Sequence, residues 1–420
     1  MSEFNFQQNI QIKRVILVSS VVIFLMMGTY LNNTETQFET YEYPAISESI
    51  RERPIRSTTV ARNNSYYDIM NMPQIEFNNL YKNPCWVGTD ENGPLDDEKF
   101  HCLPYFYILG VKKSGTTDLF TRISKHPQFA RPDMKESQWL TRIRFGVNAQ
   151  YKSVQAILQR TKLDVRSVGF YVSMFDTAAS SIMRTVTNID DRAPYFRMIT
   201  GDATPANLHM HTKWSKLPGN EGLTEPKYTN FHYIKHLTPE AKIIIIFREP
   251  VSRMLSDYLY LNRLRPTLIP EKFHRDSVRL TKAYEKCFLT YSQRRCIYNE
   301  TLKETLRKTG TGMTPSFTAG FYAFYLKEIY EVFDKSNVLP ILMTDYTENM
   351  KNVLSKVFDF LELDQPSTEQ WKPILVKSIE NESKFKRVKM LSKTKRLLEH
   401  FYRPHNEEMA KLLNDSRYLF

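Results

Sequence analysis

YFYILGVKKSGTT, residues 105–117, is the stretch of this 420-residue chain that decides its fold. Residues 105–109 are apolar or aromatic and predict a buried β-strand, and a loop bounded by Gly110 and Gly115 follows directly. Residues 118–125 then show a helical pattern. A glycine-bounded loop that enters a helix presents backbone N–H groups and the positive end of the helix dipole, and both attract phosphate. The stretch therefore predicts an α/β protein with an anion-binding loop after this strand.

Two further strands are predicted downstream. KIIIIF, residues 242–247, is almost purely β-branched, which is typical of a strand buried on both faces of a parallel sheet. Residues 338–343 form a third candidate, although the internal Pro340 disfavours a central position. Alternating strands and helices predict a central parallel sheet flanked by helices, with ligands bound beyond the carboxyl ends of the strands. The helical patterns lie at residues 251–261, 321–333 and 393–413.

The loop sequence GVKKSGTT is close to the pattern G-x-x-x-x-G-K-[ST] that binds nucleoside triphosphates, with one departure. Thr116 stands where that pattern has its lysine, and the cation lies inside the loop instead, at Lys113. This placement disfavours a magnesium-bound triphosphate. Two alternatives stay open at this point: a P-loop kinase that uses a nucleoside triphosphate, and an ordinary glycine turn with exposed lysines.

A second phosphate contact is predicted where the KIIIIF strand ends and the sequence continues as REPVSRMLSDY, residues 248–258. Arg248 offers a planar fork for a phosphate at the strand end. Pro250 suits the first turn of a following helix. Ser256 lies one turn beyond Ser252 and on the same face of that helix. Taken alone, the segment is equally consistent with an ordinary strand-to-helix turn.

Together the two segments resemble the nucleotide site of sulfotransferases that use 3′-phosphoadenylyl sulfate (PAPS). KSGTT, residues 113–117, is similar to their 5′-phosphosulfate loop, and R-x-P-x-x-R-x-x-S-x-Y, residues 248–258, is similar to their 3′-phosphate motif. The order and spacing of the motifs resemble the Golgi carbohydrate sulfotransferases, above all the N-acetylgalactosamine 4-sulfate 6-O-sulfotransferase type, which acts on chondroitin or dermatan sulfate. The similarity covers most of residues 84–420, including NPCW at 83–86, CLPYFYILG at 102–110, GDATP at 201–205, GFYAFYLKEI at 320–329 and FYRPHNEEMAKLL at 401–413.

The resemblance implies a P-loop-like sulfotransferase fold and a role for each matched residue. Lys113 would contact the bridging oxygen and the sulfuryl group, and so stabilise the departing nucleotide. Arg248 and Ser256 would hold the 3′-phosphate, which distinguishes PAPS from ATP. We expect no metal requirement, because sulfuryl transfer depends chiefly on a stabilised leaving phosphate. The residues implied to bind the 5′-phosphate are Ser114, Gly115, Thr116 and Thr117.

A general base for the acceptor hydroxyl is predicted in KESQW, residues 135–139. The family usually has a K-E-x-H-aromatic segment at this distance from the phosphate loop, which implies that Glu136 takes the hydroxyl proton. Gln138 departs from that pattern, because histidine is common there. The implied reaction moves a sulfuryl group from PAPS to a glycosaminoglycan hydroxyl, the 6-OH of N-acetylgalactosamine 4-sulfate. The alternative is a catalytically inactive membrane protein that keeps the fold and only binds glycans.

The formal charge of +12 favours a polyanionic partner. The chain contains no zinc-finger, homeodomain or RNA-stacking motif, which disfavours nucleic acid and leaves anionic lipid, a nucleotide or a sulfated glycan. The family resemblance implies that the partner is a sulfated glycosaminoglycan acceptor. A solvated basic surface is the alternative for any single cation. The lone histidines His126, His209 and His211 are expected to be structural or exposed. The cations expected to line an acceptor cleft are Lys213, Lys216, Lys384, Lys386, Arg387 and Lys389.

The N-terminus predicts the compartment. Residues 15–31 form an uncharged apolar run, with Lys13 and Arg14 before it and acidic residues after it, which indicates a transmembrane signal anchor with a cytoplasmic N-terminus. The short span suits the thin membranes of the early secretory pathway, so a single-pass type II protein of the Golgi is expected. Residues 1–14 would be the cytoplasmic tail, 32–80 a lumenal stem and 81–420 the sulfotransferase domain. A cleaved signal peptide and a secreted protein form the alternative.

Two features agree with a lumenal body. The four cysteines form two local pairs, Cys85 with Cys102 and Cys287 with Cys296, and disulfides are favoured over free thiols in an oxidising lumen. Five sequons predict N-glycosylation, at Asn32, Asn63, Asn299, Asn381 and Asn414.

Overall fold

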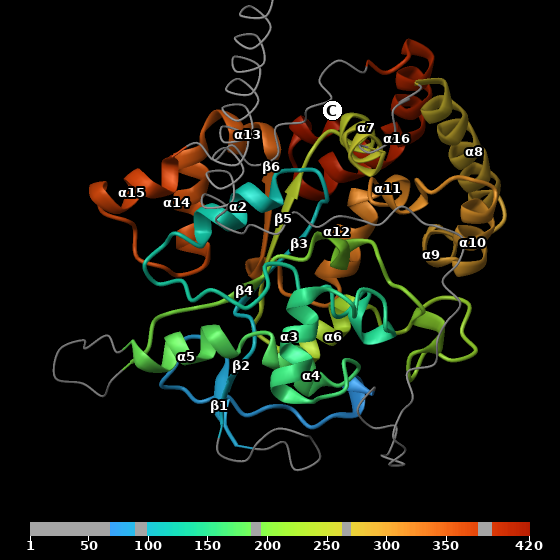
Figure 1. Cartoon of the computed structure of the whole chain (residues 1–420). Coiled ribbons are helices and arrows are strands. Elements are labelled where there is room, and N and C mark those ends of the chain that lie inside the picture. Colours follow the sequence, from blue (N-terminus) through green and yellow to red (C-terminus); the bar gives the residue numbers. More distant parts are fainter. Residues whose placement is uncertain (1–67, 89–98, 186–194, 263–269, 377–388) are drawn as a thin grey trace, which may run out of the picture. The chain divides into compact units, whose positions relative to one another are not determined.

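A parallel sheet in the strand order β4-β3-β5-β6 forms the centre of the protein (Figure 1). Its inner strands are β3 (Phe106–Gly110) and β5 (Lys242–Phe247), and its edges are β4 (Gly201–Asp202) and β6 (Val338–Leu342). This computed structural model describes residues 68–88, 99–185, 195–262, 270–376 and 389–420. The predicted central parallel sheet is thereby confirmed.

The β-branched run of β5 is buried on both faces of the sheet. Ile243 and Ile245 pack into one core cluster, whereas Ile244 and Ile246 pack into the other, and all four are 0% exposed. The same alternation holds in β3, because successive side chains of a strand point to opposite faces. A strand that is apolar at every position therefore requires helices on both sides.

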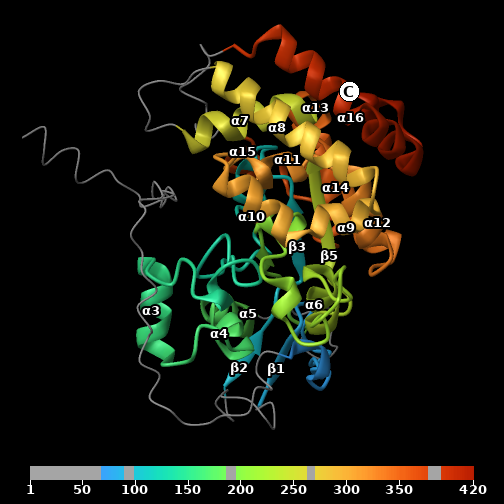
Figure 2. The same cartoon turned by 90° about the vertical axis from the view of Figure 1, so that its right-hand side faces the viewer.

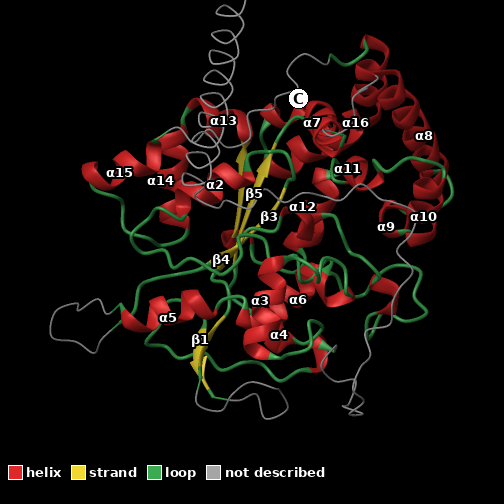
Figure 3. Cartoon of the chain, in the orientation of Figure 1, coloured by secondary structure: helices red, strands yellow, loops and turns green. Residues whose placement is uncertain are grey.

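Helices cover both faces of the sheet (Figure 3). The first face packs against α2 (Thr116–Ile123), α13 (Met343–Glu348), α14 (Met350–Phe360) and α15 (Thr368–Leu375). The second face packs against α6 (Asn230–Leu237), α7 (Pro250–Leu261), α8 (Pro270–Phe288), α12 (Tyr322–Tyr330) and α16 (Ser392–Leu413).

The other described helices have 10 residues or fewer. Both views show α3, α4 and α5 gathered with β1 and β2 at one end of the fold (Figure 2). The α-helices are α3 (Lys152–Thr161), α4 (Val168–Ser173), α5 (Asp176–Arg184), α9 (Gln293–Tyr298), α10 (Glu300–Lys308) and α11 (Thr314–Thr318). The 3-10 helices are η2 (Ile69–Asn71), η3 (Ile143–Phe145), η4 (Pro205–Leu208), η5 (Trp214–Lys216), η6 (Lys335–Asn337) and η7 (Ser416–Leu419).

The candidate strand that contains Pro340 is confirmed as β6. It is an edge strand, which agrees with its proline, because a missing N–H can face away from the sheet there.

One long helix was missed by the sequence analysis. α8 was not predicted, although it has 19 residues. Its buried residues recur at helical spacing, but half of them are polar and the helix is rich in charged residues, so few apolar residues mark the buried side. These buried residues are Phe273, Asp276, Ser277, Leu280, Thr281 and Tyr284.

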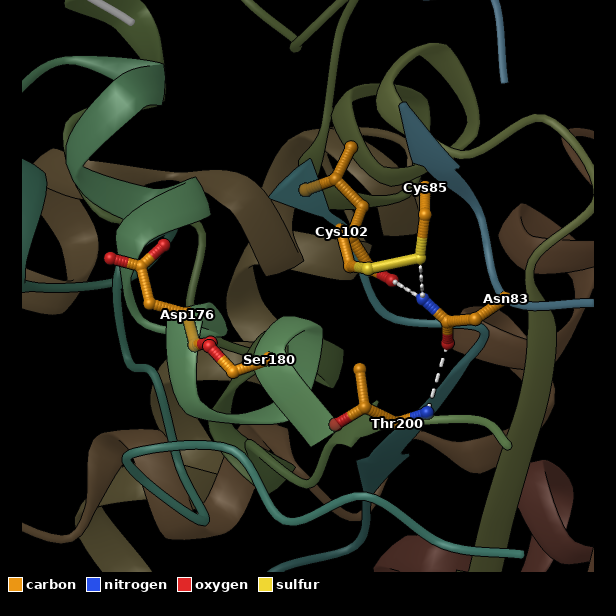
Figure 4. Close-up of a disulfide and its surroundings, with 7 residues drawn as sticks. Asn83, Cys85, Cys102, Asp176, Ser180 and Thr200 are labelled. Atoms are coloured by element: carbon orange, nitrogen blue, oxygen red, sulfur yellow. Dashed lines mark hydrogen bonds between the residues drawn. A yellow bond between two sulfur atoms is a disulfide. The ribbon is translucent and has the colours of Figure 1, made fainter. Parts of the chain in front are cut away.

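Both predicted disulfides are present. Cys85 and Cys102 are bonded across the antiparallel pair β1 (Cys85–Val87) and β2 (Phe100–Cys102), and Cys287 is bonded to Cys296. Asn83 lies against the first bridge, with its amide nitrogen 3.2 Å from Sγ of Cys85 (Figure 4). The first bridge is fully buried, so it fastens the hairpin that leads into β3.

The predicted anchor, residues 15–31, lies outside the described residues, and within the described part no helix is long and apolar enough to cross a membrane. Packed structure begins inside the predicted stem, because Ile69 is 1% exposed and belongs to the core. Of the sequons, Asn299 caps α10 and Asn414 is exposed at the end of α16, whereas Asn32, Asn63 and Asn381 lie outside the described residues.

Candidate active site

The phosphate loop and Arg248 lie at the same edge of the sheet, because β3 and β5 are parallel neighbours. The loop at residues 110–115 leads from β3 into α2, and Arg248 lies between β5 and α7. A guanidinium N–H of Arg248 donates a hydrogen bond to the carbonyl oxygen of Lys113 at 3.1 Å. The two segments that sequence reasoning singled out are therefore in direct contact.

The loop has room for an anion at the start of α2. Gly115 adopts a left-handed conformation, with φ of +88°, and is the N-cap of α2. Because the cap is a glycine, no cap side chain occupies the first N–H groups of the helix, which remain suited to a phosphate. Ser114 is 0% exposed, and its hydroxyl has no hydrogen-bond partner among the described residues. A buried hydroxyl in this state fits a loop that is completed by a ligand.

The two loop lysines have different surroundings. Lys112 forms an ion pair at 2.8 Å with the buried carboxylate of Asp257 on α7. Burial opposes ionisation of Asp257, but Lys112 and then Arg253 outweigh it and hold the pKa of Asp257 below its ordinary value. Lys113 instead has its ammonium 4.1 Å from the ring centre of Tyr260, a cation–π contact. Lys112 is thus the loop lysine that is paired with a buried carboxylate, and Lys113 lies against an aromatic ring.

Arg248 is half-buried, and burial lowers its pKa from the ordinary value. Its carbonyl oxygen accepts a hydrogen bond of 2.7 Å from the hydroxyl of Tyr322. Arg253, the second arginine of the motif, is 0% exposed and donates to Tyr322 and to the backbone of Ser316, so it anchors α7 to α11 and α12. Ser256 is half-buried on α7, and no hydrogen bond joins it to Arg248 in this structure.

Glu136 is brought to the phosphate loop by Lys135. The ammonium of Lys135 lies 3.1 Å from the hydroxyl of Thr117 and 2.7 Å from a carboxylate oxygen of Glu136. One lysine therefore bridges the loop and the predicted base. The sequence analysis named Glu136 but assigned no role to Lys135, although it is the adjacent residue.

A buried carboxylate, Asp202 at the end of β4, supports the segment that carries Glu136. It accepts hydrogen bonds from the hydroxyl and backbone N–H of Ser137 and from Thr204. The hydroxyl of Tyr171 lies 3.4 Å from it. Burial raises the pKa of Asp202. Sequence reasoning missed this residue as a supporting group, although the GDATP segment that contains it was part of the family resemblance.

Asp202→Asn is expected to change how stability depends on pH. The raised pKa means that folded Asp202 binds a proton that the unfolded chain has already lost, in the window between the ordinary aspartate value of about 3.9 and the raised value. The wild type should therefore lose stability relative to D202N as pH rises through that window. Thermal denaturation of both proteins between pH 4 and 7 measures the difference, with the exposed Asp359→Asn as control. A difference in Tm that is constant with pH would contradict the assignment.

The three histidines are buried, whereas the described basic residues of the expected acceptor cleft are exposed. His126, His209 and His211 are buried, and burial lowers the pKa of His211 to about 3, so these side chains are neutral core residues as expected. Lys213, Lys216 and Lys389 are exposed, whereas Lys384, Lys386 and Arg387 lie outside the described residues.

Comparison with known proteins agrees with this geometry. The profile of the sulfotransferase family matches residues 104–304, which span the phosphate loop, the Glu136 segment and Arg248. The chain is 31% identical over 326 residues to human carbohydrate sulfotransferase 15, covering 76% of this chain and 55% of that protein. It is 27% identical over 160 residues to the membrane-associated sulfotransferase kil1 of Dictyostelium discoideum, covering 38% of this chain and 23% of that protein.

A solved sulfotransferase from Alicyclobacillus acidocaldarius is also similar, with a TM-score of 0.46 and 19% identity over 75% of this chain and 98% of that one. The chain spans about half the length of the human relative. The family match and the 31% identity to the human protein agree with the motifs that meet at the carboxyl ends of β3 and β5. On this evidence the chain belongs to the sulfotransferase family.

Proposed function

We propose that this protein transfers a sulfuryl group from PAPS to a hydroxyl of a glycosaminoglycan, and that the acceptor is the 6-OH of N-acetylgalactosamine 4-sulfate in chondroitin or dermatan sulfate. The observation that carries the proposal is the meeting of three groups at one edge of the sheet. Arg248 contacts the backbone of Lys113, and Lys135 joins Thr117, in the first turn of α2, to Glu136. A phosphate loop, a second phosphate ligand and a carboxylate base are the parts that sulfuryl transfer needs.

The proposed reaction is an in-line displacement at sulfur. The acceptor oxygen forms a bond to sulfur while the bond from sulfur to the bridging oxygen of the nucleotide phosphate breaks. Glu136 takes the proton of the acceptor hydroxyl, and Lys113 stabilises the negative charge that develops on the leaving phosphate. Preorganised cations at the leaving group act best where burial limits solvent screening.

The nucleotide would be held at both of its phosphate groups. Ser114, Gly115, Thr116 and Thr117 surround the start of α2, where N–H groups and the helix dipole favour the 5′-phosphate. Arg248 and Ser256 would bind the 3′-phosphate. The buried hydroxyl of Ser114, which has no hydrogen-bond partner within the described part of the chain, supports the assignment of the 5′-phosphate.

The carbohydrate acceptor is supported by the similarity to carbohydrate sulfotransferase 15 and by the formal charge of +12, which suits a polyanionic chain. We also propose that the protein works in the Golgi lumen as a type II membrane protein, with a tail at residues 1–14, an anchor at 15–31, a stem that starts at residue 32 and ends before the packed residue Ile69, and a catalytic domain after it. The two disulfides support an oxidising compartment.

The test is to incubate the full chain with radiolabelled PAPS and a panel of chondroitin, dermatan, heparan and desulfated chains. Transfer to chondroitin-type chains, with the label on carbon 6 of N-acetylgalactosamine 4-sulfate after digestion, is the expected result. Transfer only to another chain class would overturn the acceptor assignment. Nucleotide binding without transfer to any chain would favour an inactive glycan-binding protein, and absence of PAPS binding would overturn the proposal as a whole.

Arg248→Ala is expected to remove the discrimination for a 3′-phosphate. A hydrogen bond to a charged group contributes about 1.5–3 kcal/mol, so the Kd for adenosine 3′,5′-bisphosphate should rise about 10- to 100-fold. The Kd for a nucleotide that lacks the 3′-phosphate should barely change, and calorimetric titration of both ligands measures this difference. An equal loss for both nucleotides would contradict the assignment of Arg248 to the 3′-phosphate.

A further inference from the structure

Gln138 has a backbone conformation that is uncommon for a residue with a side chain. Its φ is +47°, in the left-handed region, which disfavours non-glycine residues. The surroundings hold it there. Its N–H donates to the hydroxyl of Thr204 at 3.2 Å, and its carbonyl oxygen accepts from the N–H groups of Arg142 and Ile143 at 2.9 and 3.1 Å. A strained residue that is held by several contacts is characteristic of functional sites.

The side chain of Gln138 lies between Asn148 and the predicted base. Gln138 is 4% exposed, and its amide nitrogen lies 3.5 Å from Oε2 of Glu136. The amide nitrogen of Asn148 donates to Oε1 of Gln138 at 3.0 Å. Asn148 is itself 8% exposed and also has a left-handed backbone, with φ of +67°.

The hydrogen bond from Asn148 determines which end of the Gln138 amide faces Glu136. Because Asn148 donates to the amide oxygen, the amide nitrogen of Gln138 faces Glu136 and can only donate to it. Lys135 contacts the other carboxylate oxygen of Glu136 at 2.7 Å. The carboxylate is thereby held at both oxygens, and each oxygen keeps a lone pair that can accept a hydroxyl proton. The contact of 3.5 Å is long, as catalytic hydrogen bonds often are before substrate binds.

We propose that Gln138 is a positioning residue for Glu136 and that Asn148 orients the Gln138 amide. The proposal rests on the proposed function, since it gives the role of base to Glu136. A glutamine in this place holds the carboxylate with a neutral donor. An imidazole would add a group that titrates near pH 6.5, within the working range of a lumenal enzyme. The glutamine therefore fixes the geometry of the base and adds no titrating group beside it.

The direct test compares kcat and its pH profile for the full-length wild type, Gln138→Leu and Gln138→Glu. Q138L removes the donor, and kcat should fall about 10- to 100-fold with the KM for PAPS unchanged, since a hydrogen bond to a charged group contributes about 1.5–3 kcal/mol. Q138E preserves the shape but places a second carboxylate beside Glu136, next to the charges of Lys135 and buried Asp202. A like charge favours the protonated base, so the acid limb should move to higher pH. A purely structural role would lower activity without moving that limb.

A double-mutant cycle tests whether Asn148 acts on Glu136 through Gln138. Asn148→Gly keeps the left-handed backbone and removes the amide that orients Gln138. N148G should lower kcat in the wild type and have no further effect in Q138L, whereas independent structural effects would add. Gln159→Leu is the matched control, because Gln159 is an exposed glutamine on α3. Its kcat and pH profile should equal those of the wild type.

Two outcomes would overturn the proposal in distinguishable ways. If the wild type transfers sulfuryl groups, and Q138L and Q138E share its kcat and pH profile, Gln138 has no positioning role. If the wild type itself shows no transfer to any acceptor, the proposed function fails and this inference fails with it. If thermal denaturation shows that Q138L does not fold, kcat and the pH profile are compared for N148G and Q138E instead. N148G preserves the left-handed backbone, and Q138E preserves the shape of the side chain.

Discussion

Lys113→Ala is expected to lower kcat for sulfuryl transfer by about 10²- to 10³-fold, which is the typical loss when one preorganised donor is removed from a developing negative charge. Lys112 cannot replace it, because Lys112 is held in an ion pair with the buried Asp257. The ammonium of Lys113 lies over the ring of Tyr260, at the loop where the leaving phosphate would be bound. Single-turnover kinetics with radiolabelled PAPS measure the effect on the chemical step.

The control for this substitution is Lys125→Ala. Lys125 follows the same helix α2, and its ammonium donates to the backbone carbonyl oxygen of Pro373, away from the loop. K125A should keep the kcat of the wild type. A loss in K113A that appears only in the KM for PAPS, with kcat unchanged, would show that Lys113 binds the nucleotide without stabilising the transition state.

Glu136→Gln is expected to lower kcat by about 10²- to 10⁴-fold, the range for removal of a general base. The substitution keeps the size of the side chain and the contact to Lys135, so nucleotide affinity should stay close to that of the wild type. The acid limb of the kcat profile should also disappear, because the group that must be deprotonated is gone. Rates from about pH 3.5 to 8, a range that includes the ordinary glutamate pKa of about 4.3, together with titration of adenosine 3′,5′-bisphosphate, measure both effects.

Glu348→Gln provides the matched control, because Glu348 is an exposed glutamate on α13. E348Q should retain both the rate and the pH profile of the wild type. Retention of full activity and of the acid limb in E136Q would exclude Glu136 as the base and direct attention to another group near the loop.

Features that depend on neighbouring residues in the chain could be predicted from the sequence. The β-branched KIIIIF run became β5, and the glycine-bounded loop became a connection from β3 into α2. Both disulfides join cysteines that are close in the sequence, with separations of 17 and 9 residues. Strand period, turn chemistry and short loop closure are local properties, so they can be read without a structure.

The helix α8 shows where local reasoning fails. Its buried side includes Asp276, Ser277 and Thr281 as well as apolar residues, so its hydrophobic pattern is interrupted. The hydroxyls of Ser277 and Thr281 donate to backbone carbonyl oxygens of the same helix, whereas the burial of this side depends on packing against distant elements such as α16. Sequence periodicity does not contain that information.

The amino-acid sequence therefore specifies the central strands, the anion-binding loop and the family of this protein, because each is written in a short contiguous pattern. The supports of the site join residues far apart in the chain, such as Ser137 and Asp202 at a separation of 65, and Lys113 and Arg248 at a separation of 135. Which loop lysine is paired with a carboxylate, and which amide faces Glu136, follows from the close approach of β3, β4, β5 and α7. Such contacts depend on hydrogen-bond direction and burial across the fold, and these arise only once the chain has packed.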